Sequence, residues 1–133
     1  MSILIVDDSA VVRDLLREML AQVEGADVVG EFASPAPAIA SIRSNPPDVV
    51  LLDIDLVDGS GLEVLRAVRA EHPSVKVIVF TNFAEDICRR RCLQAGAYAF
   101  YDKNSDLRAL RQTLHGLASA GRASRNRHAT RGS

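Results

Sequence analysis

Short apolar runs alternate along the chain with longer segments in which apolar residues recur at helical spacing. Each run has four to six residues and is rich in β-branched or aromatic side chains, as buried strands are: ILIV (3–6), DVVG (27–30), VVLL (49–52), VKVIVF (75–80) and AYAFY (97–101). The segment after the first run has apolar residues three or four apart at Val12, Leu15, Leu16, Met19 and Val23. The pattern predicts five strands, each followed by a helix.

Five strand–helix repeats predict an α/β fold, because parallel strands need long, right-handed crossovers. We expect a doubly wound, five-stranded parallel sheet with five helices covering both faces. Capping and helix-breaking residues stand at the expected borders of helices: Ser9, Ser34-Pro35, Pro46-Pro47 and Ser105. The sequence predicts one domain over residues 1–118, followed by a basic, flexible tail over residues 119–133.

Composition narrows the class of protein. Of the 133 residues, 47% are hydrophobic and 25% charged, which is ordinary for a globular domain. No apolar run is long enough for a membrane-spanning helix, and the first residues lack the basic start of a secretory signal. Two cysteines exclude a disulfide scaffold. We therefore expect a cytoplasmic protein without a membrane partner.

Charge is distributed unevenly, although the net charge is only −1. The last fifteen residues contain four arginines and no acidic residue. Such a segment can bind a polyanion, but this one has no aromatic residue to stack on a base. It is also too short for a helix-turn-helix. We expect a disordered, solvated terminus and do not expect nucleic acid as a partner.

Polar side chains follow four of the five predicted strands. Asp7 and Asp8 follow the first strand, Asp53 the third, Thr81 the fourth and Lys103 the fifth. Each has an ordinary structural explanation on its own, such as a helix cap, a turn residue or a surface charge. The carboxyl ends of parallel strands, however, meet at one edge of a sheet, where ligands bind. The combination therefore predicts a functional site.

The chemistry of this set suggests phosphoryl transfer. Crowded carboxylates repel one another unless a cation lies among them, and hard oxygen ligands suit Mg²⁺. A carboxylate oxygen can then attack phosphorus and form an aspartyl phosphate. Lys103 and Thr81 can hold the remaining phosphoryl oxygens through a charge and a hydroxyl group.

Four segments make the chain resemble the receiver domain of bacterial two-component response regulators over residues 2–118. They are ILIVDDS (3–9), VVLLDIDLVDGSGLEVL (49–65), VIVFT (77–81) and AGAYAFYDK (95–103). The resemblance implies the flavodoxin-like strand order 2-1-3-4-5. It also implies a phosphoprotein of a two-component or phosphorelay pathway, which receives its phosphoryl group from a histidine kinase or a histidine phosphotransfer protein.

The resemblance assigns roles to the residues at the strand ends. Asp53 would be the phosphoacceptor, and Lys103 would contact the phosphoryl group. Asp8 and Asp53 would bind Mg²⁺ directly, the backbone carbonyl of Asp55 would be a third ligand, and Asp7 would act through water.

The resemblance also implies a switch. Thr81 would move to hydrogen-bond the phosphoryl group, and Phe100 would turn inward behind it. The output would be binding to a downstream target protein or onward phosphotransfer. The protein would not be an enzyme beyond assisting its own phosphorylation and dephosphorylation. The sequence leaves open whether the protein forms a homodimer.

The sequence departs from the family's commonest pattern beside the site, at Val57, Asn82 and Asn104. Asn104 follows Lys103 where proline is usual, so we expect no cis-proline turn here. Asn82 stands where a small residue is usual and crowds the room that Thr81 needs. Asp55 and Phe83 occupy positions that influence the access of water to the phosphoryl group. None of these departures changes the five core residues.

Two alternative functions remain on the sequence alone. DIDLV (53–57) fits the D-x-D-x-[TV] signature of haloacid-dehalogenase phosphohydrolases, with Thr81-Asn82 as a second motif and Lys103 as their lysine. The order of elements argues against it, because the acidic pair of that family comes last and here it comes first. The other alternative is a binding module that works without phosphorylation.

Three further features are weighed separately. Cys88 and Cys92 lie on one helix face and are expected to be buried small hydrophobes, since a zinc site needs two more ligands. The Arg89-Arg90-Arg91 run is a solvated face or a partner contact on the fourth helix.

We expect a stand-alone receiver, although a longer regulator cut after its receiver would leave a similar tail.

Overall fold

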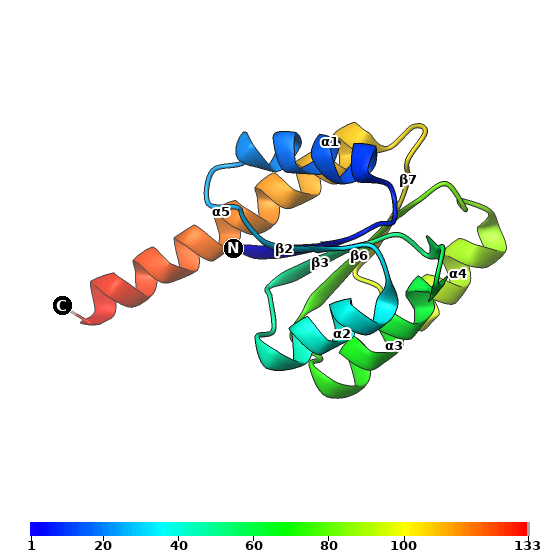
Figure 1. Ribbon diagram of the computed structural model, residues 1–133. Helices are drawn as coiled ribbons and strands as arrows, with labels where there is room; N and C mark the ends of the chain where they lie inside the picture. Colours follow the sequence, from blue (N-terminus) through cyan, green and yellow to red (C-terminus); the bar gives the residue numbers. More distant parts are fainter. Residues whose placement is uncertain (133) are drawn as a thin grey trace.

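The computed structural model describes the backbone of residues 1–132 and the side chains of residues 1–124. Its main sheet has five parallel strands in the order β2-β1-β3-β6-β7 (Figure 1). In that order the strands are Asp27–Phe32, Ser2–Val6, Val49–Leu52, Lys76–Thr81 and Ala99–Asp102. They are the five predicted strands, and their order is the predicted 2-1-3-4-5.

Helices cover both faces of the sheet, which confirms the doubly wound architecture. Figure 1 shows α1 (Ala10–Ala21) and α5 (Leu107–Gly132) on one face. The other face carries α2 (Pro35–Ser44), α3 (Gly61–Glu71) and α4 (Asp86–Gln94). No helix in the described part of the chain is long and apolar enough to cross a membrane.

Two hydrophobic cores form because strand side chains alternate between the faces. In β1, Ile3 and Ile5 pack with the side chains of α1 and α5, whereas Leu4 and Val6 pack with those of α2, α3 and α4. All four residues of β3 are buried. Burial on both faces explains why the three inner strands, β1, β3 and β6, appear in the sequence as continuous apolar runs.

The borders of the helices follow the expected signals at three of four places. The Ser9 hydroxyl accepts a hydrogen bond from the Val12 amide at 3.3 Å, which caps α1. Pro35 opens α2 directly after Ser34, and α2 ends before Pro46-Pro47. The prediction for Ser105 was wrong. Helix α5 begins at Leu107, and the carbonyl of Asp106 accepts the Leu110 amide at 2.9 Å.

Two short strands follow β3 that the sequence did not predict. β4 (Asp55–Leu56) and β5 (Gly59–Ser60) pair as an antiparallel hairpin. Strands of two residues are too short to show an alternating pattern, so sequence periodicity cannot find them. The hairpin leads the chain from the end of β3 into α3.

After residue 118 the backbone continues as part of α5 to Gly132 (Figure 1). This segment has no proline and is rich in alanine and arginine, which favour helix. The Arg122 side chain also donates a hydrogen bond to the carbonyl of Glu24, at the turn after α1. The domain boundary at residue 118 and the flexibility of the segment after it both stay predictions, and residue 133 lies outside the described residues.

Gly61 allows α3 to begin against the end of β3. Its amide donates to the carbonyl of Ile54 at 2.8 Å. A Cβ atom at this position would lie 2.2 Å from the carbonyl oxygen of Asp53 and 2.8 Å from the Cα of Ile54. Any side chain would therefore push the backbone on which Asp53 is placed.

Replacing Gly61 by alanine should destabilise the fold, because the added methyl group overpacks a backbone contact. We expect Gly61→Ala to lower the free energy of unfolding by about 2 kcal/mol in urea titrations. Gly116→Ala is the matched control, since no atom outside the neighbouring backbone of its own helix lies within 4 Å of its added Cβ, and it should stabilise α5 slightly. Equal stability of the two variants would contradict this account of Gly61.

The two cysteines should differ in reactivity. Cys92 is fully buried, and burial, followed by the neighbouring Cys88, raises the pKa of its thiol to about 12. Cys88 is half-buried. In folded Cys88→Ser protein, the remaining thiol should react with a chromogenic disulfide reagent only as fast as the protein unfolds. Rapid, complete labelling of that variant under native conditions would show that burial does not protect the Cys92 thiol from the reagent.

Candidate functional site

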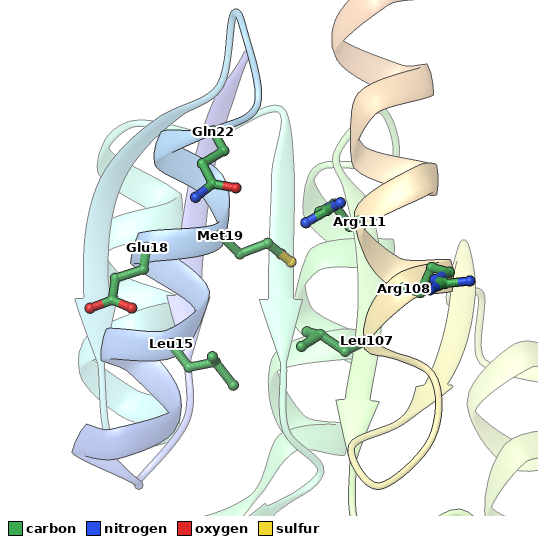
Figure 2. Close-up of a pocket in the computed structure, with 7 residues that line it drawn as sticks. All are labelled: Leu15, Glu18, Met19, Gln22, Leu107, Arg108 and Arg111. Atoms are coloured by element: carbon green, nitrogen blue, oxygen red, sulfur yellow. The ribbon is translucent and has the colours of Figure 1, made fainter.

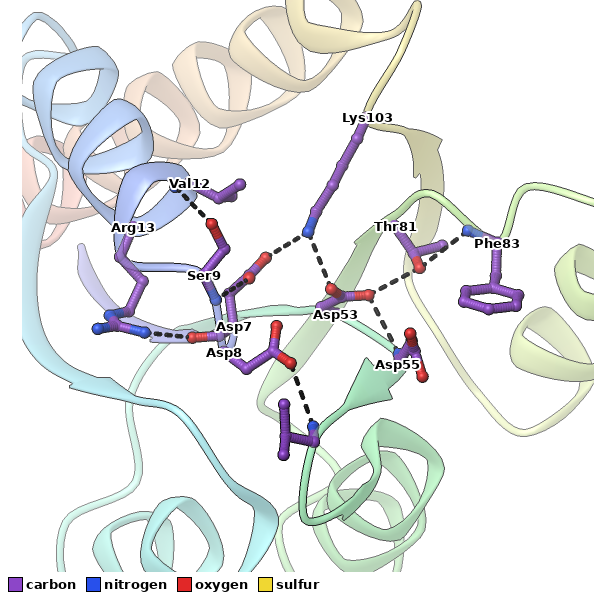
Figure 3. Close-up of polar contacts among 11 residues, drawn as sticks. Asp7, Asp8, Ser9, Val12, Arg13, Asp53, Asp55, Thr81, Phe83 and Lys103 are labelled. Carbon is purple, nitrogen blue, oxygen red and sulfur yellow. Dashed lines mark hydrogen bonds and ion pairs between the residues drawn. The ribbon is translucent and has the colours of Figure 1, made fainter.

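The polar residues that follow the strands meet at one edge of the sheet (Figure 3). Asp7 and Asp8 follow β1, Asp53 follows β3, Thr81 ends β6 and Lys103 follows β7. Asp7, Asp53 and Thr81 are the buried polar residues of the domain, among the residues described. The structure thus brings together all five residues that the strand pattern placed at this edge.

Lys103 joins two of the carboxylates. Its ammonium Nζ lies 2.7 Å from Oδ2 of Asp7 and 2.8 Å from Oδ2 of Asp53. Burial works to lower the pKa of Lys103, but hydrogen bonds to Asp53 and Asp7 and their charges outweigh it, so its pKa lies above its ordinary value. The lysine is therefore a fixed positive charge between two buried carboxylates.

The other oxygen of Asp53 is held by neutral donors. Its Oδ1 accepts a hydrogen bond from the Thr81 hydroxyl at 2.7 Å and one from the Asp55 amide at 3.1 Å. The Thr81 hydroxyl in turn accepts the Phe83 amide at 3.2 Å. Both oxygens of Asp53 thus have fixed partners, and the carboxylate has a single orientation (Figure 3).

The acidic pair after β1 is held by backbone groups. Oδ1 of Asp7 accepts the Ser9 amide at 2.9 Å, and Arg13 donates to the carbonyl of Asp7 at 2.6 Å. Burial raises the pKa of the Asp7 carboxyl, and the hydrogen bond from Lys103 opposes this shift without cancelling it. Asp8 is less buried, and its Oδ2 accepts the Val57 amide at 3.1 Å.

Carboxylate oxygens of Asp7, Asp8 and Asp53 all lie within 4.8 Å of one another. In the described part of the chain, this is the one group of three or more acidic, histidine or cysteine side chains close enough to hold a metal ion. Its all-oxygen donors fit Mg²⁺ or a similarly hard cation. A metal role for the backbone carbonyl of Asp55 stays a prediction, and Cys88 and Cys92 belong to no such group.

Phe100 and Thr81 take a defined arrangement. The Phe100 side chain is only 4% exposed and packs in the core under α2, α3 and α4. Thr81 is fully buried and points at Asp53. The structure therefore holds Phe100 inward while Thr81 contacts the central carboxylate.

The loop that carries Lys103 is fixed by two acidic side chains that the sequence analysis missed. Oδ2 of Asp106 accepts the Asp102 amide at 2.9 Å, and Oδ1 of Asp102 accepts the Asn104 amide at 2.8 Å. No described peptide bond is cis. The D-K-N-S-D run was the available signal, since aspartates often bond the backbone of their own turn.

A separate cavity of about 390 Å³ lies between α1 and α5 (Figure 2). Leu15 and Met19 face Leu107 across it, and Arg108 and Arg111 line it from α5. None of the residues at the strand ends lines this cavity. The acidic cluster and this cavity are therefore separate sites.

Comparison with known sequences identifies the family. The family model for the response regulator receiver domain matches residues 3–115. Response regulator GacA of Pseudomonas viridiflava is 37% identical over 112 residues, which are 84% of this chain and 52% of that protein. Response regulator UvrY of Escherichia coli is 34% identical over 104 residues, which are 78% of this chain and 48% of that protein. The chain spans about half the length of these relatives.

Solved structures agree on the fold. A two-component response regulator of the LuxR family from Aurantimonas sp. SI85-9A1 superposes with a TM-score of 0.81 at 28% identity, over 90% of this chain and 85% of that one. A chain of the CheX-CheY-BeF3-Mg+2 complex from Borrelia burgdorferi gives 0.80 at 24% identity, over 88% of each chain. At that identity the second match shows a similar fold alone.

One relative is at odds with part of the expectation about partners. The DNA-binding transcriptional activator DevR/DosR of Mycobacterium tuberculosis is 34% identical over 102 residues, which are 77% of this chain and 47% of that protein. DNA binding is thus part of the name of that relative, and the matched region makes up about half of its length.

The matches support neither alternative function, the phosphohydrolase or the phosphorylation-independent module. Asp53 directly follows the central strand β3 and the acidic pair directly follows β1, as the resemblance to receiver domains implied. Sequence, fold and the arrangement of polar side chains at the sheet edge agree, and the chain belongs to the family of response regulator receiver domains.

Proposed function

We propose that this domain is a phosphorylation-dependent signalling switch in which Asp53 accepts a phosphoryl group from a histidine kinase or a histidine phosphotransfer protein. The observation that carries the proposal is the environment of Asp53. Its carboxylate is fixed between the Lys103 ammonium and the Thr81 hydroxyl, beside Asp7 and Asp8.

The chain's own residues supply most of what the transfer needs. An oxygen of Asp53 attacks phosphorus, and the bond from phosphorus to the donor nitrogen breaks, so that the nitrogen leaves with the electron pair. Lys103 balances the charge that the phosphoryl oxygens bring, and the Thr81 hydroxyl turns from the carboxylate to one of those oxygens. Mg²⁺ would be held directly by Asp8, Asp53 and the Asp55 carbonyl, with Asp7 acting through water, and it would supply further positive charge for the transferred group.

The signal leaves the site through Thr81 and Phe100. A phosphoryl group on Asp53 gives Thr81 a new acceptor, which favours the arrangement in which Thr81 lies toward Asp53 and Phe100 is buried. The phosphoryl group can shift the population only by its preference for that arrangement. The changed surface over α4, β7 and α5 would then bind a downstream protein, or the phosphoryl group would pass to a second histidine.

Asp53 should be the single site of phosphorylation. Incubation with acetyl phosphate and Mg²⁺ should add one phosphoryl group to the intact mass of the protein. The addition should be absent in Asp53→Asn protein and without the metal. Asp58→Asn is the matched control, because Asp58 is an exposed carboxylate in the β4–β5 turn.

Three results would count against the proposal. An adduct that persists in Asp53→Asn protein would place the acceptor elsewhere. Sustained, Asp53-dependent release of free phosphate from small phosphomonoesters would revive the phosphohydrolase alternative. If the protein gains no phosphoryl group and releases no phosphate, a module that signals without phosphorylation would be favoured.

The Asp106 carboxylate should matter for the reaction although it lies outside the acidic cluster. Asp106→Ala removes the acceptor for the Asp102 amide, which loosens the loop that aims Lys103. We expect phosphorylation by acetyl phosphate to slow by roughly tenfold, because a small displacement of a charged group is costly in such sites.

Asn104→Ala is the control for the Asp106 variant, measured by the same mass assay. It removes an exposed side chain of the same loop and keeps the backbone amide that Asp102 accepts. This variant should be phosphorylated at the normal rate. A similar slowing in both variants would mean that any change in the loop is harmful.

A further inference from the structure

Arg89 differs from the two arginines that follow it on α4. Its guanidinium carbon lies 4.9 Å from the centroid of the Phe100 ring, and its Nη1 donates to the carbonyl oxygen of Phe100 at 3.3 Å. Arg89 is half-buried, whereas Arg90 and Arg91 are exposed. One side chain of α4 thus contacts both the ring and the backbone of a single residue of β7.

The contact with the ring depends on the position of Phe100. A cation is attracted to the face of an aromatic ring only while it lies over that face. The ring is buried among the side chains under α4, including Cys92 and Val79. If Phe100 turned outward to solvent, the guanidinium would lose the ring face, although it could keep the carbonyl. Arg89 therefore favours the buried position of Phe100 over an exposed one.

The guanidinium of Arg89 has no ion-pair partner within 4.0 Å in the described structure. Among residues 1–124, no carboxylate forms an ion pair with Arg89. Arg13, Arg17 and Arg43, by contrast, all contact acidic side chains. The described contacts of the Arg89 guanidinium are thus with the two parts of Phe100.

Phe100 is linked to the central carboxylate through the sheet. It pairs with Val79 of β6, and Thr81 lies two residues further along β6 with its hydroxyl on Asp53. The Lys103 amide also donates to the carbonyl of Thr81 at 3.0 Å. A contact that favours the inward position of Phe100 therefore acts on the same short stretch of β6 and β7 that holds Thr81 and Lys103 in place.

We propose that Arg89 is a positioning residue for the switch: it holds Phe100 inward, and it thereby favours the arrangement in which Thr81 contacts Asp53. The proposal rests on the proposed function, because it assumes that this arrangement is the one that phosphorylation of Asp53 stabilises. It assigns a role to one arginine of the Arg89-Arg90-Arg91 run and none to the other two.

Fluorine NMR of protein labelled with fluorophenylalanine can test the bias before any phosphorylation. The chain has four phenylalanines, and a Phe100→Leu variant assigns the signal of Phe100. Phe80 and Phe83 supply the reference shifts for a buried and an exposed ring, since they are 3% and 51% exposed. NOEs from the Phe100 ring to the Val79 methyl groups report separately that the ring points inward.

Three variants separate the charge of Arg89 from its packing. Arg89→Met keeps an apolar stem but loses the charge and the donor, Arg89→Lys keeps the charge, and Arg90→Met is the control on the exposed face. We expect Arg89→Met to lower the ratio of inward to outward Phe100 by roughly fivefold. Arg89→Lys should lie between it and the wild type, and Arg90→Met should match the wild type. Thermal unfolding of each variant checks that the fold is kept.

Two outcomes would overturn the proposal. In one, Arg89→Met leaves the Phe100 signal and its NOEs unchanged. In the other, Arg90→Met shifts them as much, which would show a general effect of charge on α4.

Mass measurements of phosphorylation on the same samples keep this proposal distinct from the proposed function. In one outcome the Phe100 ring turns outward in Arg89→Met protein, but Asp53 is not phosphorylated even in the wild type. That outcome would refute the proposed function and support the role of Arg89 in keeping Phe100 inward. Normal phosphorylation with an unmoved ring would refute the role of Arg89 alone.

Discussion

The repulsion among three carboxylates at one edge of the sheet is the constraint on which the rest of the site depends. Their oxygens lie within 4.8 Å of one another, a separation at which two like charges repel by roughly 3.5 kcal/mol at an effective dielectric of 20. Lys103 offsets part of this repulsion by contacting Asp7 and Asp53 together. The neighbouring groups serve the same end, because Ser9, Asp55 and Val57 each offer an amide to one of the carboxylates.

The site is connected to both helical layers by different residues. Thr81 and Phe100 lead to the layer of α4, where Arg89 contacts the ring. Lys103 leads to the opposite layer, because its loop is fixed by Asp106 immediately before α5. Asp53 is therefore connected to the two faces of the sheet by separate sets of contacts, one through an aromatic side chain and the other through a backbone turn.

What the sequence could predict followed from short-range order. Buried strands appear as apolar runs, and the residue after each run must lie at the sheet edge, so Asp53 and Lys103 could be placed without a structure. The close approach of Gly61 to the Asp53 carbonyl and the hold of Asp106 on the Lys103 loop could not be found this way. They depend on how the backbone turns between elements, for which periodicity carries no signal. The helical continuation after residue 118 could not be predicted either, because a polar, basic composition without apolar periodicity carries no signal for a packed helix.

That continuation has a mechanical consequence. Helix α5 begins four residues after Lys103 and runs without interruption for 26 residues, a length of about 39 Å. A rod of that length magnifies small rotations at its base. A tilt of the whole helix by about 10° about Leu107 would carry the far end sideways by about 7 Å, more than a full helical turn's rise. Leu110 and Leu114 are buried against the sheet, so such a tilt requires them to repack. The far end of α5 would therefore report small changes of packing near the Lys103 loop as large displacements.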